Sequence, residues 1–498
     1  MSAGIATDEC QDDRSLVAER PSDGPLLDVV GAATTVPLLD GSWVTYANLD
    51  AAASAPSLTS VADRVQEVLP LYASVHRGAG YLSQVSTALY EASRRTIGAF
   101  VGARTDDVVI LTKHTTDSLN LLASAVPANE DGTPGRVLVL DLEHHANLLP
   151  WAHSPRAEGT TVDQTSTDGT HHAERATILV TAPTVHETLA ALEAELAARS
   201  YALVAVTGAS NVTGEALPLA DVVRVAHGAG ARVSLDGAQL LPHRSFSLEE
   251  SGVDYVSFSG HKLYAPFGAG ALVGRRDWLD VAAPHLAGGG AVREVTASDV
   301  AWASAPARHE AGSPNVIGAA ALAAACETLA ALPEGALAAH ETTLRARLVE
   351  GLEAIDGITV VRIWEDSTDP VGVVTFTVAD HDPGLVATYV SAEHGIGVRD
   401  GRFCAHPLIA RLGIGPGAIR ASISAATTAS DVDRLLHALR TYLTQGTSAR
   451  YEIADGCWAV AQDPRPTPAV ASALGLTPTA WAGLAGTASA CVTPVDAV

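Results

Sequence analysis

The chain contains 498 residues, 47% of them hydrophobic, and carries a formal charge of −25 at pH 7. A chain of this length and apolar content can form two domains with large cores. The negative charge argues against phosphate-rich partners, so we expect binding neither to nucleic acid nor to an anionic membrane surface. Residues 1–24 lack the apolar run of a secretory signal, and the five scattered cysteines show no CxxC pair and no zinc-ligand spacing. We therefore expect reduced thiols in the cytoplasm and no metal site.

The predicted elements begin after an acidic N-terminal extension. Residues 1–36 combine acidic residues with Pro and Gly, and we expect them to be disordered. From residue 57 to about residue 322, helical periodicity alternates with short apolar runs. This alternation is typical of a mostly parallel sheet covered by helices, and it predicts a large α/β domain over residues 37–325, whose first residues pack on the small domain. The expected strands are Val108–Leu111, Val137–Leu140, Ala176–Val180, Leu203–Val206, Val233–Leu235 and Tyr255–Phe258.

Two segments of this region depart from the alternation. Residues 157–175 are rich in Thr, Asp, Gly and His, and they predict a surface loop. Residues 316–332 are apolar and rich in alanine but contain Glu327, which favours a core helix over a membrane span.

The C-terminal part predicts a smaller domain and a tail. Helical segments and the strands Ile358–Val361 and Val371–Phe376 predict a small α/β domain over residues 326–443. Residues 444–498 are low in charge and rich in Ala, Thr, Pro and Gly, and their role has no sequence signal.

Lysine is almost absent from the chain. Only Lys113 and Lys262 occur among 31 basic residues, so a retained lysine indicates a task that arginine cannot perform. The obvious task is a Schiff base with an aldehyde. Asp236 ends the apolar run Val233–Leu235, at the position where open α/β sheets place their ligands. A carboxylate there can keep a pyridine nitrogen protonated, so the pair points to pyridoxal phosphate, unless Lys262 is an incidental surface lysine.

Short motifs around these residues follow one another in the order of a known family. The chain resembles the class V, fold-type I pyridoxal-phosphate enzymes, and looks most like their group II cysteine desulfurase and selenocysteine lyase branch. The resemblance covers residues 40–443 and implies a large domain with a mostly parallel seven-stranded sheet and a smaller C-terminal α/β domain. The motifs are Leu49–Ser54, Val75–Gly78, His114–Thr116, Glu143–Asn147, Ser210–Gly214, Asp236–Gln239, Ser259–Lys262, Gly288–Gly290, Glu310–Asn315 and Arg399–Leu408.

The resemblance implies a set of residues for the cofactor ring. Lys262 would form the Schiff base, Asp236 would pair with the pyridine nitrogen, and Gln239 would reach the ring hydroxyl. His144 would stack on the ring and take part in proton transfer. Asn211 would be a further cofactor contact or would fix a loop.

The cofactor phosphate would lie at a predicted helix start. Hydroxyl and N–H groups of Thr115 and Thr116 suit an anion there, although the same residues could be plain helix caps. Ser259 and His261 would complete the phosphate site. Ser313, where the family usually has threonine, would reach the phosphate of a partner subunit, so the resemblance implies a homodimer.

The substrate side of the site carries the departures from the family. The resemblance makes Arg420 the clamp for the amino-acid carboxylate, a role for which its planar guanidinium is suited. Arg77 would be donated across the dimer, and Arg399 and Asn147 are further expected substrate contacts, Asn147 with a supporting role as the alternative.

Cys404 matches the sulfur-accepting cysteine and lies among glycines, so we expect a mobile loop. A small buried hydrophobe is its alternative role. The family usually has histidines immediately before this cysteine, but this chain has Arg402 and Phe403. Arg402 could lower the thiol pKa, but it cannot act as a general base.

Three functions remain open at this stage. The first is a desulfurase that converts cysteine, or selenocysteine, to alanine with a persulfide on Cys404, which a sulfur-acceptor protein could then receive. The second is a C–S lyase, epimerase or aminotransferase in which Cys404 is not catalytic. The third is a non-enzymatic scaffold, which the retention of Lys262, Asp236 and His144 argues against.

Overall fold

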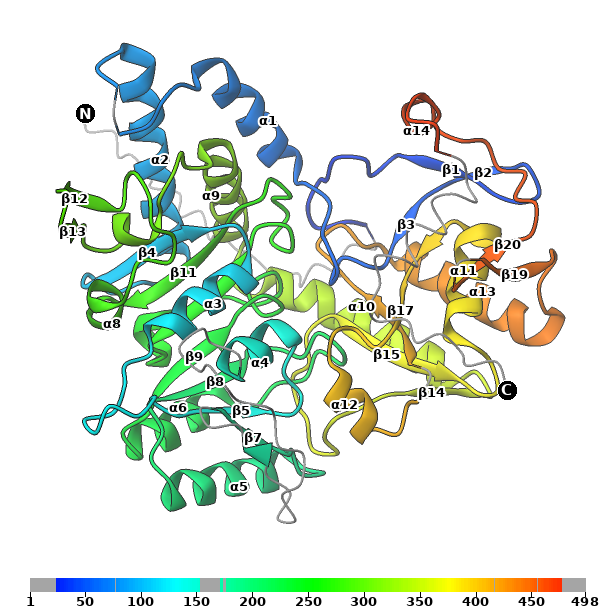
Figure 1. Cartoon of the computed structure of the whole chain (residues 1–498). Coiled ribbons are helices and arrows are strands. Elements are labelled where there is room, and N and C mark those ends of the chain that lie inside the picture. The colour runs from blue at the N-terminus through cyan, green and yellow to red at the C-terminus, as the bar shows by residue number, and fades with distance from the viewer. Residues whose placement is uncertain are drawn as a thin grey trace, which may run out of the picture.

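The computed structural model describes residues 24–76, 78–152, 171–172, 176–415, 417–454 and 456–476. Two bodies lie side by side, each with its own hydrophobic core (Figure 1). The larger body holds the long sheet, and the smaller one holds a four-stranded sheet together with the first strands of the chain. Among the helices that are described, none is both long enough and apolar enough to cross a membrane.

The long sheet is mostly parallel. Neighbouring strands pair in parallel from β10 to β7, β11 is antiparallel to both of its neighbours, and the two-residue β6 adds an antiparallel edge. Seven strands plus this short edge confirm the expected fold-type I α/β class. In spatial order the strands are β4 (Asp107–Thr112), β11 (Gly270–Arg275), β10 (Tyr255–Ser259), β9 (Arg232–Asp236), β8 (Leu203–Thr207), β5 (Val137–Leu140), β7 (Ala176–Leu179) and β6 (His171–His172).

Helices cover both faces of this sheet, which explains why its strands are apolar throughout rather than alternating. Val137 and Val139 of β5 enter one core, and Leu138 and Leu140 enter the other. The first core includes α3 (Thr115–Ala125), α4 (His145–Ala152) and α8 (Arg276–Val281). The second includes α1 (Thr59–Val68), α2 (Tyr81–Phe100), α5 (Val185–Ala198), α6 (Leu219–Gly228), α7 (Leu248–Ser251) and α9 (Val316–Ala330), the predicted core helix.

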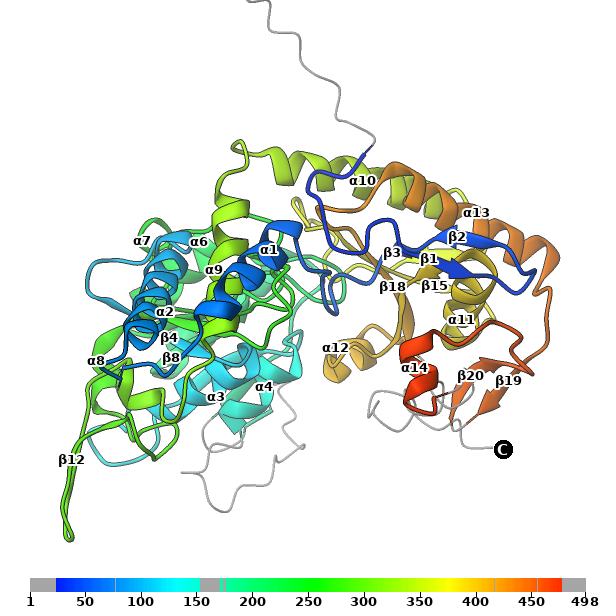
Figure 2. The ribbon, with the colours of Figure 1, turned by 90° about the horizontal axis from the view of Figure 1, so that it is seen from above.

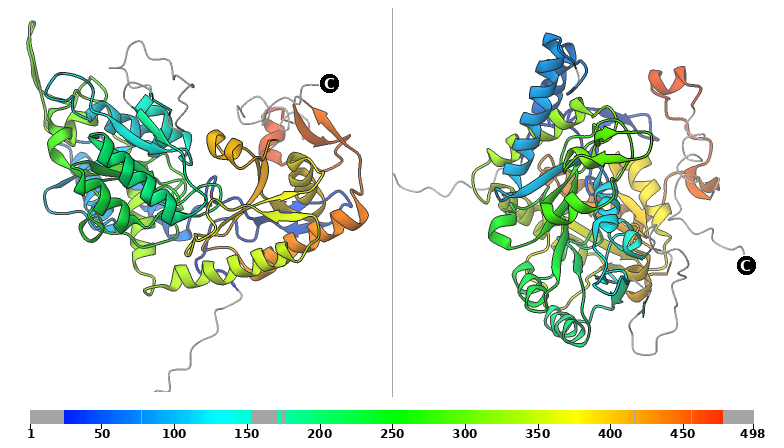
Figure 3. Two further views of the ribbon diagram at one scale, coloured as in Figure 1. Left: turned by 90° about the horizontal axis from the view of Figure 1, so that it is seen from below. Right: turned by 60° about the vertical axis from the view of Figure 1, so that its left-hand side comes forward.

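The smaller body is built on an antiparallel sheet in the order β14 (Ile358–Val360), β15 (Val373–Val378), β18 (Ala418–Ser422) and β17 (Arg399–Gly401). Figure 3 shows α10 (Ala336–Glu353) and α13 (Ala429–Gln445) side by side along this body. Their apolar faces pack with α11 (Pro383–His394) around Phe376 and Ile419. The short helix α12 (His406–Arg411) follows β17.

The N-terminal segment differs from the expected disorder within its described part. Leu26 and Leu27 donate their N–H groups to the Ala425 carbonyl, at 2.7 and 3.0 Å, and Val29 bridges to Leu58. The hairpin β1 (Thr35–Pro37) and β2 (Trp43–Thr45) follows, and β3 (Ala47–Asn48) pairs with β16 (Ile396–Gly397) of the smaller body. The expectation of disorder came from the acidic composition of residues 1–36 as a whole, in which the apolar residues from Leu26 onward carry little weight. Residues 1–23 lie outside the described part.

Two further segments fall partly outside the described residues. The tail forms a hairpin of β19 (Tyr451–Ala454) and β20 (Cys457–Val460), then α14 (Ala469–Ala473), and Tyr451 Oη donates to Glu393 at 2.9 Å. Of the expected loop 157–175, only β6 is described. In Figure 2 the hairpin of β12 (Val292–Val295) and β13 (Val300–Trp302) projects away from the larger body.

Candidate active site

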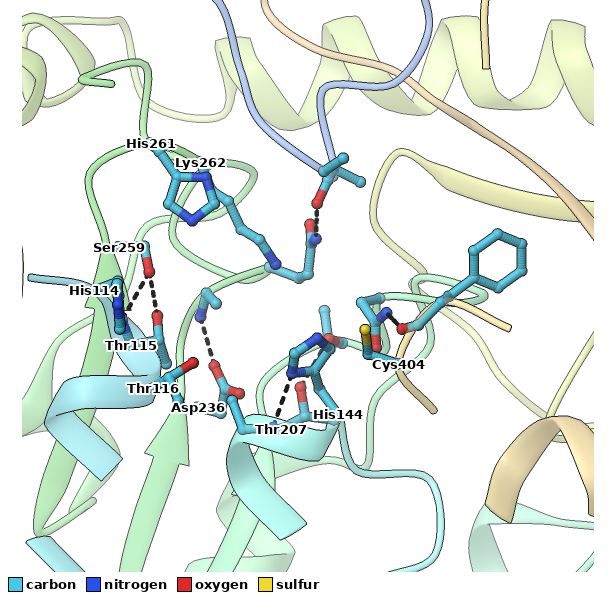
Figure 4. Close-up of a pocket in the computed structure, with 18 of the residues that line it drawn as sticks. His114, Thr115, Thr116, His144, Thr207, Asp236, Ser259, His261, Lys262 and Cys404 are labelled. Atoms are coloured by element: carbon cyan, nitrogen blue, oxygen red, sulfur yellow. Dashed lines mark hydrogen bonds between the residues drawn. The ribbon is translucent and has the colours of Figure 1, made fainter. Parts of the chain in front are cut away.

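A cavity of about 360 Å³ lies at the carboxyl ends of the parallel strands, between the two bodies. This is where an open α/β sheet binds its ligands. Figure 4 shows side chains of the larger body on one side of the cavity and Cys404 on the other. The lining residues with polar side chains are His114, Thr115, Thr116, His144, Thr207, Asn211, Asp236, Gln239, Ser259, His261, Lys262, Arg399, Cys404 and Arg420.

Lys262 and Asp236 come from neighbouring strands. Asp236 is the last residue of β9, opposite Ser257 of β10, and Lys262 follows the end of β10. Burial raises the pKa of Asp236, while the 3.0 Å bond from the Ala238 N–H and the charge of Lys262 act in the opposite direction. Burial lowers the pKa of Lys262 to about 8, opposed by Asp236. The site therefore holds an amine that loses its proton close to neutral pH, beside a carboxylate.

His144 follows β5 and is held as a neutral imidazole. Its Nδ1 accepts the Ala146 N–H at 3.0 Å, so the proton of the neutral ring is on Nε2. Burial lowers the pKa of His144 to about 3, and the charge of Lys262 contributes to the shift. In Figure 4 the ring lies between Asp236 and Cys404. An uncharged ring with one N–H suits both stacking on an aromatic ligand and proton transfer.

The residues of the predicted anion site lie at the start of α3 and at and just beyond the end of β10. Thr115 donates its N–H to Ser259 Oγ at 2.7 Å, and the two hydroxyls are 2.6 Å apart. His114 is the N-cap residue of α3, and its Nδ1 accepts the Asp117 N–H. The two threonines are therefore not the cap, and Thr115, Thr116 and His261 all line the cavity.

Gln239 has one buried atom that nothing in the described chain satisfies. Its Nε2 donates to the Ala52 carbonyl at 2.6 Å, whereas Oε1 has no hydrogen-bond partner among the described residues. Such an atom carries a desolvation cost unless a ligand donates to it. A ring hydroxyl at this position would satisfy it, so the residues present fit the implied cofactor.

Arg420 and Arg399 lie opposite each other on β18 and β17 of the smaller body. Arg420 is buried, donates from Nη2 to Asp50 at 3.0 Å and from Nη1 to the Asn211 carbonyl at 2.9 Å, and stacks over Phe403. Its buried Nε has no partner in the described structure. A planar guanidinium suits a carboxylate, and Nε is an atom that such a ligand could satisfy.

Cys404 lies in a tight turn between β17 and α12. Phe403 and Cys404 both have φ of +53°, a region that side chains other than glycine rarely occupy. Asn211 Nδ2 donates to the Phe403 carbonyl at 2.7 Å, and the His145 N–H donates to the Cys404 carbonyl at 2.8 Å. The expected mobile loop is thus, in this structure, a turn whose carbonyls are bonded to the larger body.

Two expected site residues, Asn147 and Ser313, are not brought to the cavity, and a third lies outside the described residues. Asn147 is buried, donates to Glu143 at 2.7 Å and is absent from the lining, so the substrate contact is corrected to a supporting role. Glu143 accepts the Thr207 N–H, so Asn147 steadies the end of β8. Ser313 is exposed away from the cavity, and Arg77 lies outside the described residues. Their roles across a dimer stay predictions.

Sequence reasoning missed several residues of the site. Ala52, His114, Thr207 and Phe403 line the cavity, and Asp50 pairs with Arg420 from 370 residues away. Asp50, Ala52 and His114 belong to motifs that marked the resemblance, so a signal existed for them. For Thr207, the only sequence signal for a place in the cavity was its position at the end of an apolar strand.

Comparison with known proteins places the chain in a family. The model of the aminotransferase class-V family matches residues 47–435. The chain belongs to this family. Its expected class V, fold-type I character is thereby confirmed.

Members of the family with similar sequences and structures are cysteine desulfurases. The cysteine desulfurase of Dickeya dadantii (strain 3937) is 34% identical over 398 residues, which cover 79% of this chain and 91% of that protein. The probable cysteine desulfurase 2 of Mycobacterium leprae (strain TN) is 36% identical over 412 residues, with coverage of 80% and 91%.

Two solved structures extend the similarity to three dimensions. The cysteine desulfurase CsdA from Escherichia coli, in an S-sulfonic acid form, has a TM-score of 0.69 and 32% identity, and covers 80% of this chain and 94% of its own. The apo cysteine desulfurase from Thermococcus onnurineus NA1 has a TM-score of 0.70 and 29% identity, with coverage of 80% and 95%. This class V chain is therefore cysteine desulfurase-like along most of its length.

Proposed function

We propose that this class V enzyme is a cysteine desulfurase that uses pyridoxal phosphate and releases alanine from cysteine, or from selenocysteine. One observation carries the proposal: the Cys404 thiol and the Lys262 amine line the same cavity from opposite bodies. A sulfur acceptor and the residue that holds the cofactor thus face one substrate site. The names of the similar proteins support the same reaction.

The cavity suits pyridoxal phosphate residue by residue. When bound, this cofactor supplies an electron sink for bonds at the substrate Cα. Lys262 would hold its aldehyde, Asp236 its pyridine nitrogen, and Gln239 Oε1 its ring hydroxyl. The phosphate would lie at the start of α3, where N–H groups favour an anion. The contacts there are Thr115, Thr116, Ser259 and His261.

The remaining side chains would act on the substrate. Arg420 would orient its carboxylate through Nε, with Arg399 beside it on β17. The neutral Lys262 amine and the His144 Nε2–H can exchange protons with the substrate. Cys404 would receive the substrate sulfur as a persulfide, leaving the carbon skeleton as alanine. A thiol of an acceptor protein would then remove that sulfur.

The proposal includes a homodimer in which Arg77 and Ser313 complete the partner's site. Support comes from apolar side chains left exposed around residue 77: Leu69 is 55% exposed, Tyr72 52% and Tyr81 78%. Mixing inactive Lys262→Ala chains with inactive Arg77→Ala chains should restore about a quarter to a half of the activity per site, because one dimer then contains one intact site. No recovery after verified chain exchange would place Arg77 outside the partner's site.

The cytoplasmic location also remains a prediction from the cysteine pattern.

The residues immediately before Cys404 favour a second candidate function. Arg402 and Phe403 replace the histidines that the family usually has, so a C–S lyase that does not use Cys404 is the alternative. Product analysis of the purified holoenzyme on cysteine separates the two. The desulfurase releases alanine, and alanine formation collapses in Cys404→Ser. Pyruvate as the main product, or parental alanine formation by Cys404→Ser, would establish the alternative.

A further inference from the structure

His145 contacts the Cys404 turn from the larger body at two points. It is the first residue of α4, and its N–H donates to the Cys404 carbonyl at 2.8 Å. Its ring Nε2 accepts the backbone N–H of His406 at 3.5 Å. The His145 and His406 rings also meet edge to face, with centroids 4.5 Å apart and an interplanar angle of 80°. One residue thus holds the chain at Cys404 and again two residues later.

The turn needs such external contacts. Phe403 and Cys404, two consecutive non-glycine residues, both have φ of +53°, and such strained backbone persists only where its surroundings enforce it. Within the turn, the Ala405 N–H donates to the Arg402 carbonyl at 3.0 Å. From the larger body, Asn211 donates to the Phe403 carbonyl and the His145 N–H donates to the Cys404 carbonyl.

The ring contact requires an uncharged His145. An imidazolium carries a proton on both nitrogens, so Nε2 could no longer accept from His406. Burial lowers the pKa of His145, and the neighbouring His406 lowers it further. Burial also lowers the pKa of His406, with a contribution from Arg402.

Other titratable groups also lie around this junction. The His144 and His145 rings have centroids 6.3 Å apart, and the Cys404 carbonyl accepts the His145 N–H. On α12, Arg411 is paired with Asp141 at 2.7 Å, which neutralises both charges. A proton on His145 would therefore add positive charge next to His406 and Arg402.

We propose that His145 is a positioning residue for Cys404 and that it works only as the neutral imidazole. The larger body thereby directs the thiol into the cavity, in a chain whose residues before the cysteine are Arg402 and Phe403. This inference rests on the proposed function only for the role of Cys404. If the proposal holds, sulfur transfer slows at low pH because His145 becomes protonated and the Cys404 turn loses a contact, and not because the cofactor changes.

Two substitutions separate the ring contact from the backbone contact. His145→Phe keeps the ring and the N–H to Cys404 but removes the acceptor for His406. His145→Gln supplies an amide oxygen as acceptor and does not titrate. His437→Phe and His437→Gln on the exposed face of α13, outside the cavity, are the matched controls.

The first measurement is hydrogen exchange of the backbone N–H of His406. It should become roughly tenfold faster in His145→Phe, because its acceptor is lost, and should return towards the parental rate in His145→Gln. The same N–H in the parent should lose protection as the pH falls. Unchanged exchange in His145→Phe would overturn the contact.

The second measurement is the pH profile of alanine formation by the holoenzyme. At neutral pH, His145→Phe should lower kcat by roughly tenfold to a hundredfold with KM for cysteine nearly unchanged, since a misplaced thiol affects the reacting geometry. The parental acid limb, with a midpoint below about 6.5, should move to lower pH in His145→Gln. A parental kcat in His145→Phe, or an unmoved limb in His145→Gln, would contradict the proposal. Failure of the proposed function would instead appear as parental alanine formation in Cys404→Ser, whatever the exchange data.

Discussion

The two sides of the cavity are built in different ways. On the larger body, Lys262, Asp236 and Ser259 stand at or just beyond the ends of adjacent strands of one sheet. On the smaller body, Cys404 stands in a strained turn whose carbonyls are bonded to residues of the other body. The cofactor side is thus fixed by its own sheet, whereas the sulfur side is fixed across the boundary between the bodies. Changes at this boundary should affect sulfur transfer before cofactor binding.

The largest expected effect tests the cofactor side. Lys262→Ala should lower turnover by roughly a thousandfold or more, because no other amine can hold the cofactor aldehyde. Borohydride reduction of the parental holoenzyme should attach the label to the peptide containing Lys262. Lys113→Ala, which changes the only other lysine, is the matched control and should keep parental activity. A label on Lys113 would refute the assignment.

Asp236→Asn should have the next largest effect. The variant should still bind the cofactor yet lose roughly a hundredfold or more in kcat, because a neutral amide does not hold the pyridine nitrogen protonated. Cofactor absorbance and kcat, measured on the same preparation, check this. Near-parental turnover would mean that the carboxylate has another task.

Arg420→Lys tests the smaller body's side of the cavity, where the substrate carboxylate is expected to bind. A lysine cannot contact Asp50, the Asn211 carbonyl and a substrate carboxylate at once, so KM for cysteine should rise roughly tenfold to a hundredfold while cofactor binding is retained. Arg347→Lys in the exposed pair with Asp433 is the control, since such pairs contribute little. Loss of the cofactor in Arg420→Lys would show that the two sides are not independent.

The last prediction concerns the rate of cofactor uptake by the apoprotein, which should depend on pH. The pKa of Lys262 is lowered to about 8, so below this pH the amine is mostly protonated and cannot react with an aldehyde. The uptake rate should therefore rise about tenfold per pH unit below pH 8 and level off above it. Stopped-flow absorbance from pH 6 to 10 measures the rate. A rise that continues to pH 10 would contradict the lowered pKa.

The difference between the two sides also explains what the sequence could predict. Asp236 and Lys262 follow apolar strands within short local motifs, so their positions at the sheet edge could be derived without the structure. The contacts of the sulfur side join residues far apart in the chain, as in the pair of Asp50 with Arg420. Neither periodicity nor spacing reports such contacts, and the link from His145 to Cys404 was invisible for that reason.

Elements were missed where local composition was ambiguous. The antiparallel strand β11 begins with Gly270 and carries Gly274, which leaves an apolar run of only three residues, 271–273. The hairpin of residues 451–460 lies in a segment whose average composition resembles a linker.

One site residue also differs from its expected place. The sequence predicts a substrate contact for Asn147, but on α4 its side chain donates to Glu143.

The central claim is that the sulfur of cysteine moves from the cofactor side to Cys404. A single turnover with one equivalent of cysteine per site, quenched and digested for mass spectrometry, tests it directly. We expect the peptide containing Cys404 to gain one sulfur atom in step with the release of one alanine, and His145→Phe to slow both equally. Alanine release without sulfur on Cys404, or sulfur found on another cysteine, would contradict the account.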